Sequence, residues 1–460
     1  MKDTGGYIRD AKELQVMQSY PLWMKVMLTK QRIREWVYQF GEDGVVVSFS
    51  GGKDSTVLLH LVREEFPNVK AVFSNTGLEY PEIQRFVKSF DNVDIVTPSM
   101  NFGEVISTYG YPLIGKEVAE AIHYARRIRS QTGNVERERE RERTIRRKRA
   151  ELLGHRTSSK RAAPQTDGQS CKAGGERNQL ETIGILGGQN LQSLFKRTEL
   201  QGTRDSSPRR AGVASGKTGE GGAFSNPTEQ FGQKSMFNKE KWLPLAREAP
   251  FLISHYCCFK MKKSPMHKYQ TEHDYKPILA TLAEESRVRR QAWIRHGCNA
   301  FDSKNPTSQP MSFWTEQDVL AYIVENHLPI ASVYGDIVSL GTDGNSYPAV
   351  DIAGNVQCNL KCTGCQRTGC IFCAFGAHLE KGESRFQRLA KTHPRQYEYC
   401  IGGGEWVDNP FYDPAAPVWD GEWKNWNPKK IWSRNAKGLG LGKVFDICNE
   451  LYGRDFIRYE

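Results

Sequence analysis

The pattern of apolar and polar residues is clearest from Val45 to Leu61, where an apolar run is followed by a glycine turn and then by an amphipathic segment. Three valines and Phe49 form a run of the length expected for a buried parallel strand. From Thr56 to Arg63 apolar residues recur at helical spacing, and Asp54 or Ser55 is well placed to cap that helix. Such a turn directs backbone N–H groups and the helix dipole at one point, so the pattern predicts a phosphate-binding strand–turn–helix unit.

The same kind of patterning predicts further elements on both sides of this unit. Ahead of it, apolar residues at helical spacing indicate two helices in residues 10–40, broken at Pro21. After it, apolar runs predict strands at 70–74, 93–96 and 278–282, and helices are expected to begin near Pro81, Gly115 and Thr315, the last as an N-cap. Strands that alternate with helices indicate an α/β fold with a doubly wound parallel sheet.

The turn at residues 50–55 reads Ser-Gly-Gly-Lys-Asp-Ser, and its residue order decides which kind of phosphate loop it is. The Walker pattern needs Ser or Thr directly after Gly-Lys, but Asp54 follows Lys53, and Val47 stands in place of the first glycine. The dinucleotide pattern of three spaced glycines is also absent. What remains resembles the PP-loop of enzymes that split ATP or a related adenylyl nucleotide between the α and β phosphates.

Two other polar turns follow predicted strands, at the edge where parallel sheets bind ligands. The turn from Asn75 to Gly77 is expected to contact the ribose or adenine of a nucleotide. The turn at residues 283–290 contains Glu-Ser-Arg. The guanidinium group of Arg287 in this turn can bind a phosphate through two parallel hydrogen bonds. For the second turn, a basic helix start on the surface is the alternative interpretation.

Seven of the 11 cysteines form two groups. Five of them lie within sixteen residues, and their two C-x-x-C pairs have the spacing of metal ligands: Cys358, Cys362, Cys365, Cys370 and Cys373. Thiolate sites of this kind hold zinc or an iron–sulfur cluster, and spacing alone does not choose between them. The adjacent pair Cys257 and Cys258 suits the separated corners of a cubane better than zinc, because successive side chains diverge; two buried, inert thiols are the alternative.

The composition changes in residues 126–239, which we interpret as a basic, largely disordered insertion. Most of this segment is rich in Gly, Ser, Gln and Arg and lacks sustained periodicity. Residues 126–235 contain 23 of the 64 basic and 12 of the 53 acidic residues, which leaves 41 of each elsewhere. The net charge of +11 therefore does not show that the presumed catalytic part handles a polyanion. A solvated linker is the first interpretation, and a tether for nucleic acid or a partner is the second.

The remaining chain divides by composition into three parts. These are N-terminal helices at 1–44, a nucleotide-binding α/β domain at 45–125 and 240–335, and a cysteine-rich C-terminal subdomain at 336–460. The start of the chain has no apolar signal-peptide core, and no apolar run approaches the length of a membrane span. We therefore predict a soluble, cytoplasmic protein with no membrane partner, whose 11 clustered cysteines indicate metal or redox chemistry.

Five segments taken in order resemble the phosphoadenosine phosphosulfate (PAPS) reductase family of the PP-loop superfamily. They are SFSGGKDSTVLLHLV, SNTGLEYPE, CCFKMKKSP, AEESRVRRQAW and SFWTEQDVLAYI, and the resemblance covers roughly residues 20–125 and 240–400. It implies an adenine nucleotide alpha-hydrolase-like fold. The nucleotide contacts that it implies are Ser50, Gly51, Gly52, Lys53, Asp54, Ser55, Thr76, Gly77 and Arg287.

The iron–sulfur members of this family bind one 4Fe-4S cluster through a Cys-Cys pair and a later C-x-x-C pair. The matching residues here are Cys257, Cys258, Cys370 and Cys373. Cys358, Cys362 and Cys365 compete with them, because they could form a second site, replace the adjacent pair or supply a nucleophile.

Reductases of this family attack sulfur with a cysteine on a C-terminal tail, in an E-C-G-type motif. Here the last residues read GRDFIRYE, and Cys448 lies in an apolar helical context that predicts a packed thiol. The attacking thiol is therefore not identified by the resemblance.

Two enzymatic mechanisms follow from the resemblance, with Lys53, Asp54 and Arg287 as the candidate catalytic residues. In a reductase, a thiolate attacks the sulfur of PAPS or adenylyl sulfate. In a sulfurtransferase, ATP adenylates an oxygen of tRNA or DNA, with Asp54 positioning Mg²⁺, and a donor protein or cluster supplies sulfur. In both, Lys53 stabilises phosphate charge. A non-catalytic, zinc-ribbon nucleic-acid-binding protein is a third interpretation, which leaves the phosphate loop without a purpose.

Overall fold

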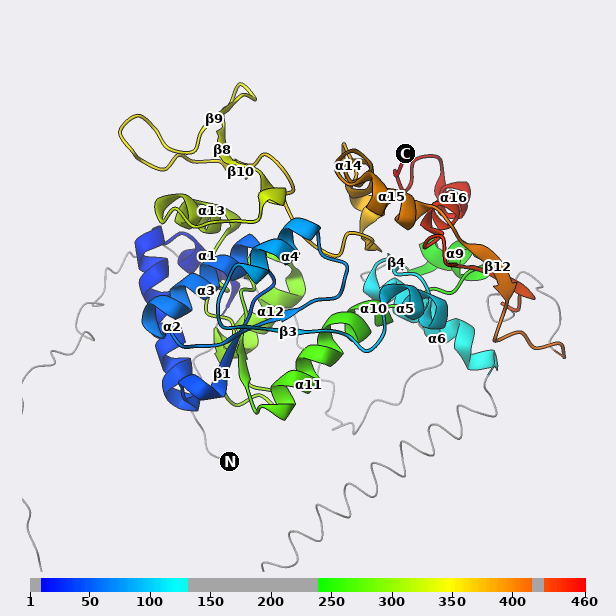
Figure 1. Cartoon of the computed structure of the whole chain (residues 1–460), viewed down its shortest axis with the longest axis horizontal. Helices are drawn as coiled ribbons and strands as arrows, with labels where there is room; N and C mark the ends of the chain where they lie inside the picture. Colours follow the sequence, from blue (N-terminus) through cyan, green and yellow to red (C-terminus); the bar gives the residue numbers. More distant parts are fainter. Residues whose placement is uncertain (1–9, 131–238, 416–425) are drawn as a thin grey trace, which may run out of the picture. The chain divides into compact units, whose positions relative to one another are not determined.

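The computed structural model describes residues 10–130, 239–415 and 426–460 (Figure 1). All of them belong to one compact unit of the chain, whereas a second unit, Gly133–Ser225, falls wholly outside the description. Most of the predicted insertion therefore lies outside the described residues. Helix α6 (Lys116–Ser130) continues beyond the predicted start of that insertion, and the Arg126 side chain on it is buried.

A six-stranded sheet forms the centre of the fold, in the order β3-β2-β1-β5-β7-β6. Its strands are β1 (Val45–Ser48), β2 (Ala71–Ser74), β3 (Val93–Val96), β5 (Lys276–Ile278), β6 (Asn299–Ala300) and β7 (Thr307–Ser308). All neighbours run parallel except β6 and β7. The chain moves outward from β1 to β2 and β3 on one side and returns on the other side as β5. This topology confirms the predicted α/β, doubly wound fold class.

Helices cover both faces of the sheet, because alternate residues of the apolar strands point to opposite sides. Val45 and Val47 of β1 belong to the main core, where α3 (Lys53–Glu65) packs on α2 (Leu22–Phe40) and α13 (Glu316–Glu325). Val46 and Val72 instead pack against Tyr269 of α11 (Ser264–Glu272). The edge of the sheet at the carboxyl ends of its strands is therefore left between two helical layers.

The remaining elements complete the N-terminal half and the connections around the sheet. They are α1 (Ala11–Gln18), η1 (Glu42–Gly44), α4 (Pro81–Lys88), α5 (Phe102–Tyr109), β4 (Leu113–Ile114), η3 (Lys239–Trp242), α9 (Leu243–Glu248), α10 (Tyr256–Cys258), η4 (Phe259–Lys263), η5 (Ala283–Glu285) and α12 (Arg287–His296). The two predicted N-terminal helices, broken at Pro21, are present as α1 and α2.

The cysteine-rich part is built from small sheets and short helices. They are η6 (Ser332–Tyr334), β8 (Ile337–Leu340), β9 (Ser346–Pro348), β10 (Leu360–Cys362), β11 (Ala374–Phe375), η7 (Ala377–Leu379), α14 (Arg385–Thr392), α15 (Pro394–Ile401), β12 (Glu405–Asp408), β13 (Lys430–Ser433) and α16 (Leu441–Tyr452). Strand β11 pairs in parallel with β4, which joins this part to the N-terminal half. Within the described ranges, no helix combines the length and apolar character needed to span a membrane.

Two local predictions were wrong. Helix α3 begins at Lys53 with Gly52 as its N-cap, so neither Asp54 nor Ser55 caps it; the Ser55 hydroxyl instead bonds back to the Gly52 carbonyl. The strand predicted at 278–282 is β5, which ends at Ile278. Leu282 is buried but does not belong to a strand, so its apolar character reflects core packing.

The predicted cap of α13 was correct. The Thr315 hydroxyl accepts a hydrogen bond from the Asp318 amide, and the Asp318 carboxylate accepts one from the Thr315 amide, which makes a capping box. This cap also fixes the backbone position of Glu316, the residue that follows Thr315.

Candidate active site

The phosphate loop between β1 and α3 is held in place by its small residues. Gly51 has a φ of +70°, and a Cβ there would lie 2.7 Å from Cγ2 of Val87 and 2.9 Å from Cγ2 of Ile83. Only glycine fits this close approach to α4 in the left-handed region. The amide of Ser50 donates to the Ser55 hydroxyl at 3.2 Å, which closes the turn. The sequence Ser-Gly-Gly therefore sets the path of the backbone into the helix.

Lys53 lies inside the protein, although it belongs to the phosphate motif. Its Nζ donates to Oε1 of Glu316 at 2.7 Å and to the carbonyl oxygen of Gln366 at 3.1 Å. Burial alone would lower the pKa of Lys53, but the carboxylates of Asp54 and Glu316 raise it. Burial also raises the pKa of Asp54, and the Lys53 charge opposes that shift. Lys53 therefore carries a positive charge that a protein carboxylate compensates.

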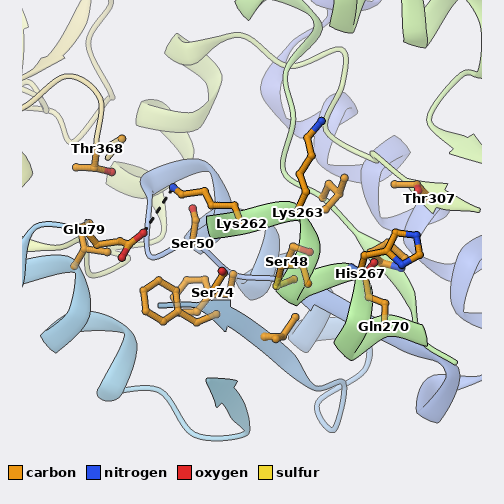
Figure 2. Close-up of a pocket in the computed structure, with 18 of the residues that line it drawn as sticks. Ser48, Ser50, Ser74, Glu79, Lys262, Lys263, His267, Gln270, Thr307 and Thr368 are labelled. Atoms are coloured by element: carbon orange, nitrogen blue, oxygen red, sulfur yellow. Dashed lines mark ion pairs between the residues drawn. The ribbon is translucent and has the colours of Figure 1, made fainter. Parts of the chain in front are cut away.

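A cavity of about 610 Å³ opens beside this loop, at the carboxyl ends of the central strands. Its walls come from the ends of β1, β2 and β5, from the helical segment η4–α11 and from the loop before Cys370. The polar residues that line it include Ser48, Ser50, Ser74, Glu79, Lys262, Lys263, His267, Gln270, Asn305, Thr307 and Thr368 (Figure 2). The size is that of a small-molecule or cofactor site. The place, where the chain order of the strands reverses, is the usual ligand position in doubly wound sheets.

Polar side chains line this cavity from one side to the other (Figure 2). In Figure 2, Lys262 reaches toward Glu79 on the side where Thr368 also lies, and the distance from Nζ to Oε1 of Glu79 is 3.6 Å. His267 and Thr307 lie at the other side. Apolar residues also line the cavity: Phe49, Val72, Phe73, Met266 and Leu279. The cavity thus offers apolar surface for a flat ring and basic groups for anions.

A second, small pocket next to this cavity collects four thiols. It is lined by Cys257, Cys258, Cys370 and Cys373, together with Leu78, Phe102, Pro112, Met261 and Lys262. The Sγ atoms of Cys257 and Cys258 are 3.9 Å apart. Across the described parts of the chain, no three Cys, His, Asp or Glu side chains are arranged around one point as metal ligands would be. The four thiols therefore share a pocket without forming a coordination geometry.

Lys262 lines both the cavity and the thiol pocket. Burial would lower its pKa, but the charges of Cys370, Glu79 and Cys258 raise it. A hydrogen bond from Cys257 lowers the pKa of Cys258 to about 6. Burial opposes this shift, and the charges of Lys116 and Lys262 support it. Burial raises the pKa of Cys370 to about 11. The pocket thus favours one thiolate close to a lysine.

The other predicted nucleotide contacts lie away from the cavity lining. Thr76 is buried, and its amide and hydroxyl both donate to the Glu79 carboxylate, at 3.0 and 2.8 Å. Gly77 is exposed. Arg287 is exposed at the first position of α12. Burial and the charge of Arg367 lower the pKa of the nearby Arg289, and the charge of Asp54 in the loop opposes that shift. Thr76 therefore orients Glu79, and neither Gly77 nor Arg287 reaches the cavity.

The three competing cysteines do not line the thiol pocket. Cys362 and Cys365 are buried and Cys358 is exposed. Burial raises the pKa of Cys362, and Lys53 partly offsets this effect. The structure thus separates Cys362 and Cys365 from the four thiols of the pocket.

The cavity and the neighbouring loop have residues that the sequence patterns do not single out. Glu79 and Lys262 line the cavity, and Glu316 contacts Lys53 of the loop. Tyr334, whose hydroxyl accepts from the Lys53 amide at 3.3 Å, has no local pattern that would reveal it. Tyr334 is 281 residues away from Lys53 in the sequence, and only the folding of the chain brings it to the loop.

Comparison with known proteins gives two matches to the first part of the chain. Residues 44–112 match the phosphoadenosine phosphosulfate reductase domain family. An uncharacterized protein of Methanocaldococcus jannaschii is 35% identical over 69 residues, which are 14% of this chain and 17% of that protein. The family match supports a PP-loop, nucleotide-binding enzyme of a sulfur-related family. It covers β1, the phosphate loop, α3, β2 and β3, and it ends before the first of the cysteines.

Proposed function

We propose that this chain is an enzyme that carries out sulfur chemistry on an adenylyl nucleotide, in the manner of PAPS or adenylyl-sulfate reductases. The observation that carries the proposal is the shared wall between the two pockets. Lys262 lines both the large cavity and the pocket of four cysteines. A nucleotide in the cavity therefore has its anionic end beside thiols that sulfur chemistry requires.

The protein's own groups account for the binding of such a nucleotide. The apolar residues of the cavity would accept the adenosine, and Ser50 of the loop together with Lys262 would face the phosphate and sulfate groups. Fixed cations and amides that are already in place stabilise developing negative charge without reorganisation. At the opposite end Lys263 and His267 offer a further basic region for a second phosphate.

A 4Fe-4S cluster is the cofactor that we propose for the thiol pocket. Four thiols around one mainly apolar pocket are the donor set that such clusters use. Cys257, Cys258, Cys370 and Cys373 would hold it, and when bound it would supply a charged, redox-active centre next to Lys262. Lys262 would then stand between the cluster and the anionic end of the substrate.

The proposed reaction breaks the bond between sulfur and the phosphate oxygen. A thiolate attacks the sulfur of PAPS or adenylyl sulfate, the adenosine phosphate leaves with the bonding electrons, and an S-sulfonate forms. A second thiol then attacks the thiol-derived sulfur of that S-sulfonate, so that sulfite leaves and a disulfide forms. The two electrons thus come from two thiols, of which at least one belongs to a dithiol protein that acts as the reductant.

A sulfurtransferase that uses ATP is the second candidate, and the position of Cys448 favours it. This thiol is completely buried in α16, and burial raises its pKa to about 12. The residues after it are also packed: the Tyr459 carbonyl accepts from the Tyr397 hydroxyl at 2.8 Å. Cys448 therefore cannot act as a mobile attacking thiol. In the ATP reaction the attack comes from a nucleic-acid oxygen, and Asp54 beside Lys53 would position Mg²⁺.

One set of incubations tests both candidates. The anaerobically purified protein is incubated with PAPS, adenylyl sulfate or ATP, together with a dithiol, and sulfite and pyrophosphate are measured. Sulfite from PAPS or adenylyl sulfate supports the reductase, and pyrophosphate from ATP supports the sulfurtransferase. If neither product forms and the protein contains zinc instead of iron, both candidates are contradicted.

Single Cys→Ser variants test the cofactor separately. We expect loss of iron and of absorbance when any of Cys257, Cys258, Cys370 or Cys373 is changed. Cys362→Ser and Cys365→Ser serve as matched controls, because both thiols are buried outside the pocket. Loss of iron in these two variants, with iron retained in the first four, would move the proposed site to the C-terminal segment.

A further inference from the structure

The lysine of the phosphate loop already has an anion beside it, and that anion belongs to the protein. The Nζ of Lys53 lies 2.7 Å from Oε1 of Glu316, the first residue of α13. The Lys53 side chain is 6% exposed, whereas that of Glu316 is 40% exposed. A buried cation is therefore held by a carboxylate that can also reach water.

The backbone of the loop is covered by the same part of the chain. The Lys53 amide donates to the Tyr334 hydroxyl at 3.3 Å, which in turn shares a hydrogen bond of 2.6 Å with the Thr368 hydroxyl. A Cβ on Gly52 would lie 3.3 Å from the Tyr334 hydroxyl and 3.7 Å from that of Thr368. Protein oxygens thus accept hydrogen bonds from the amide and from the ammonium group of Lys53, two donors that a phosphate would use.

The charges around Lys53 oppose a second anion. Asp54 and Glu316 both act on Lys53, and Glu284 accepts a hydrogen bond from the Glu316 amide at 2.6 Å. Burial and the neighbouring carboxylates raise the pKa of Glu284, against the effect of that hydrogen bond. Adding a phosphate or sulfate beside these carboxylates is unfavourable until one of them moves away. Glu316 is the carboxylate in direct contact with the Lys53 ammonium group, and its side chain can move into water.

We propose that Glu316 is a positioning residue that occupies Lys53 in place of the substrate anion and is displaced when the nucleotide binds. The inference rests on the proposed function and adds to it an internal competitor for the loop. While Glu316 is in place, Lys53 stays charged and correctly placed inside the protein. The segment Gln366–Thr368, which contacts the same lysine and Tyr334, leads directly to Cys370 in the thiol pocket.

Glu316→Gln tests the proposal, because it keeps the size of the side chain and removes its charge. Binding of inorganic pyrophosphate and of PAPS is measured by isothermal titration calorimetry. We expect Kd for both to fall roughly tenfold, the order of magnitude set by one hydrogen bond to a charged group. The thermal midpoint should fall or stay the same, so tighter binding would not come from a more stable fold.

Glu325→Gln is the matched control, because Glu325 is exposed at the other end of α13. It removes the same charge from the same helix and should leave Kd unchanged. In a Lys53→Ala background, Glu316→Gln should also have no effect on Kd, since the two residues act through one contact. Unchanged or weaker binding of pyrophosphate by folded Glu316→Gln, or an equal gain in Glu325→Gln, overturns the proposal.

The pyrophosphate measurement separates this inference from the proposed function. If Glu316→Gln gains affinity for pyrophosphate while neither PAPS, adenylyl sulfate nor ATP binds, the competitor role stands and the proposed function fails. If nucleotides bind and turn over but the substitution changes nothing, the function stands and the inference fails.

Discussion

The phosphate loop and the helical segment Tyr256–Lys263 each bring a lysine to the cavity region, and the two lysines are in different states. Lys53 of the loop is 6% exposed and lies 2.7 Å from a carboxylate oxygen. Lys262 of the helical segment is 42% exposed, and its nearest carboxylate oxygen is 3.6 Å away. Lys262 also lines both pockets, whereas Lys53 lines neither. The lysine of the Ser-Gly-Gly-Lys-Asp-Ser motif is thus buried against a carboxylate, while the lysine that faces the open space comes from another segment.

The local geometry of the second segment helps to explain this difference. Residues Phe259–Lys263 form a π-helical turn directly after Cys258 and directly before α11. Such turns are rare and occur mostly at functional sites, because the extra residue redirects the side chains around it. Here the turn lets one continuous helical run place thiols in the small pocket and Lys262 and Lys263 on the large cavity.

The largest effect is expected for Lys262→Ala. If Lys262 is the cation that faces the substrate, turnover should fall by about 10²–10³-fold, the size typical for the loss of one stabilising group at a developing charge. Sulfite or pyrophosphate release measures it, with the thermal midpoint recorded in parallel. Lys268→Ala is the control, because Lys268 is exposed on α11 and does not line the cavity. Equal turnover in Lys262→Ala and wild type would remove the distinction between the two lysines.

A smaller effect is expected from the loop glycines, and it separates backbone placement from charge. Gly51→Ala should lower the free energy of unfolding by about 2–4 kcal/mol, because a positive φ and a clash with α4 add together. Gly77→Ala has a similar φ of +72° and no atom within 4 Å of its Cβ, so only the strain of about 1–2 kcal/mol is expected. Urea unfolding measures both. Equal losses would show that α4 does not clamp the phosphate loop.

The elements whose causes are local could be predicted from the sequence. The valine run became β1, the glycine turn leads into α3, and Thr315 caps α13 through Asp318. Each of these depends on residues within a few positions of one another. The fold class followed from the same local patterns, since strands that alternate with helices build a doubly wound sheet.

The occupied state of the loop could not be predicted, because its cause is not local. Glu316 and Lys53 are separated by 263 residues, and Tyr334 and Lys53 by 281. Neither contact has a pattern in the sequence around it. Arg287 shows the reverse case: its motif suggested a phosphate contact, but helix α12 begins there and leaves the residue exposed. The use of the thiol pocket for a cluster remains a prediction.

The smallest effect is expected for a thiol that should not react in the folded protein. This experiment sharpens the contrast with the thiols beside Lys262. Cys448 is completely buried in α16, and burial raises its pKa to about 12. A raised thiol pKa means that the proton stays bound until the pH approaches that value. At pH 8 only about one thiol in ten thousand is ionised. Raising the pH from 7 to 9 should therefore leave Cys448 unlabelled by iodoacetamide in the folded protein.

Mass spectrometry of the cysteine peptides measures this labelling, with Cys358 as the control. Cys358 is exposed, so it should react in the folded protein, and Cys448 should react only after addition of denaturant. Labelling of both at the same rate without denaturant would mean that α16 opens readily. Cys448 would then be available as an attacking thiol, and sulfur chemistry would no longer depend on an external thiol or on the pocket beside Lys262.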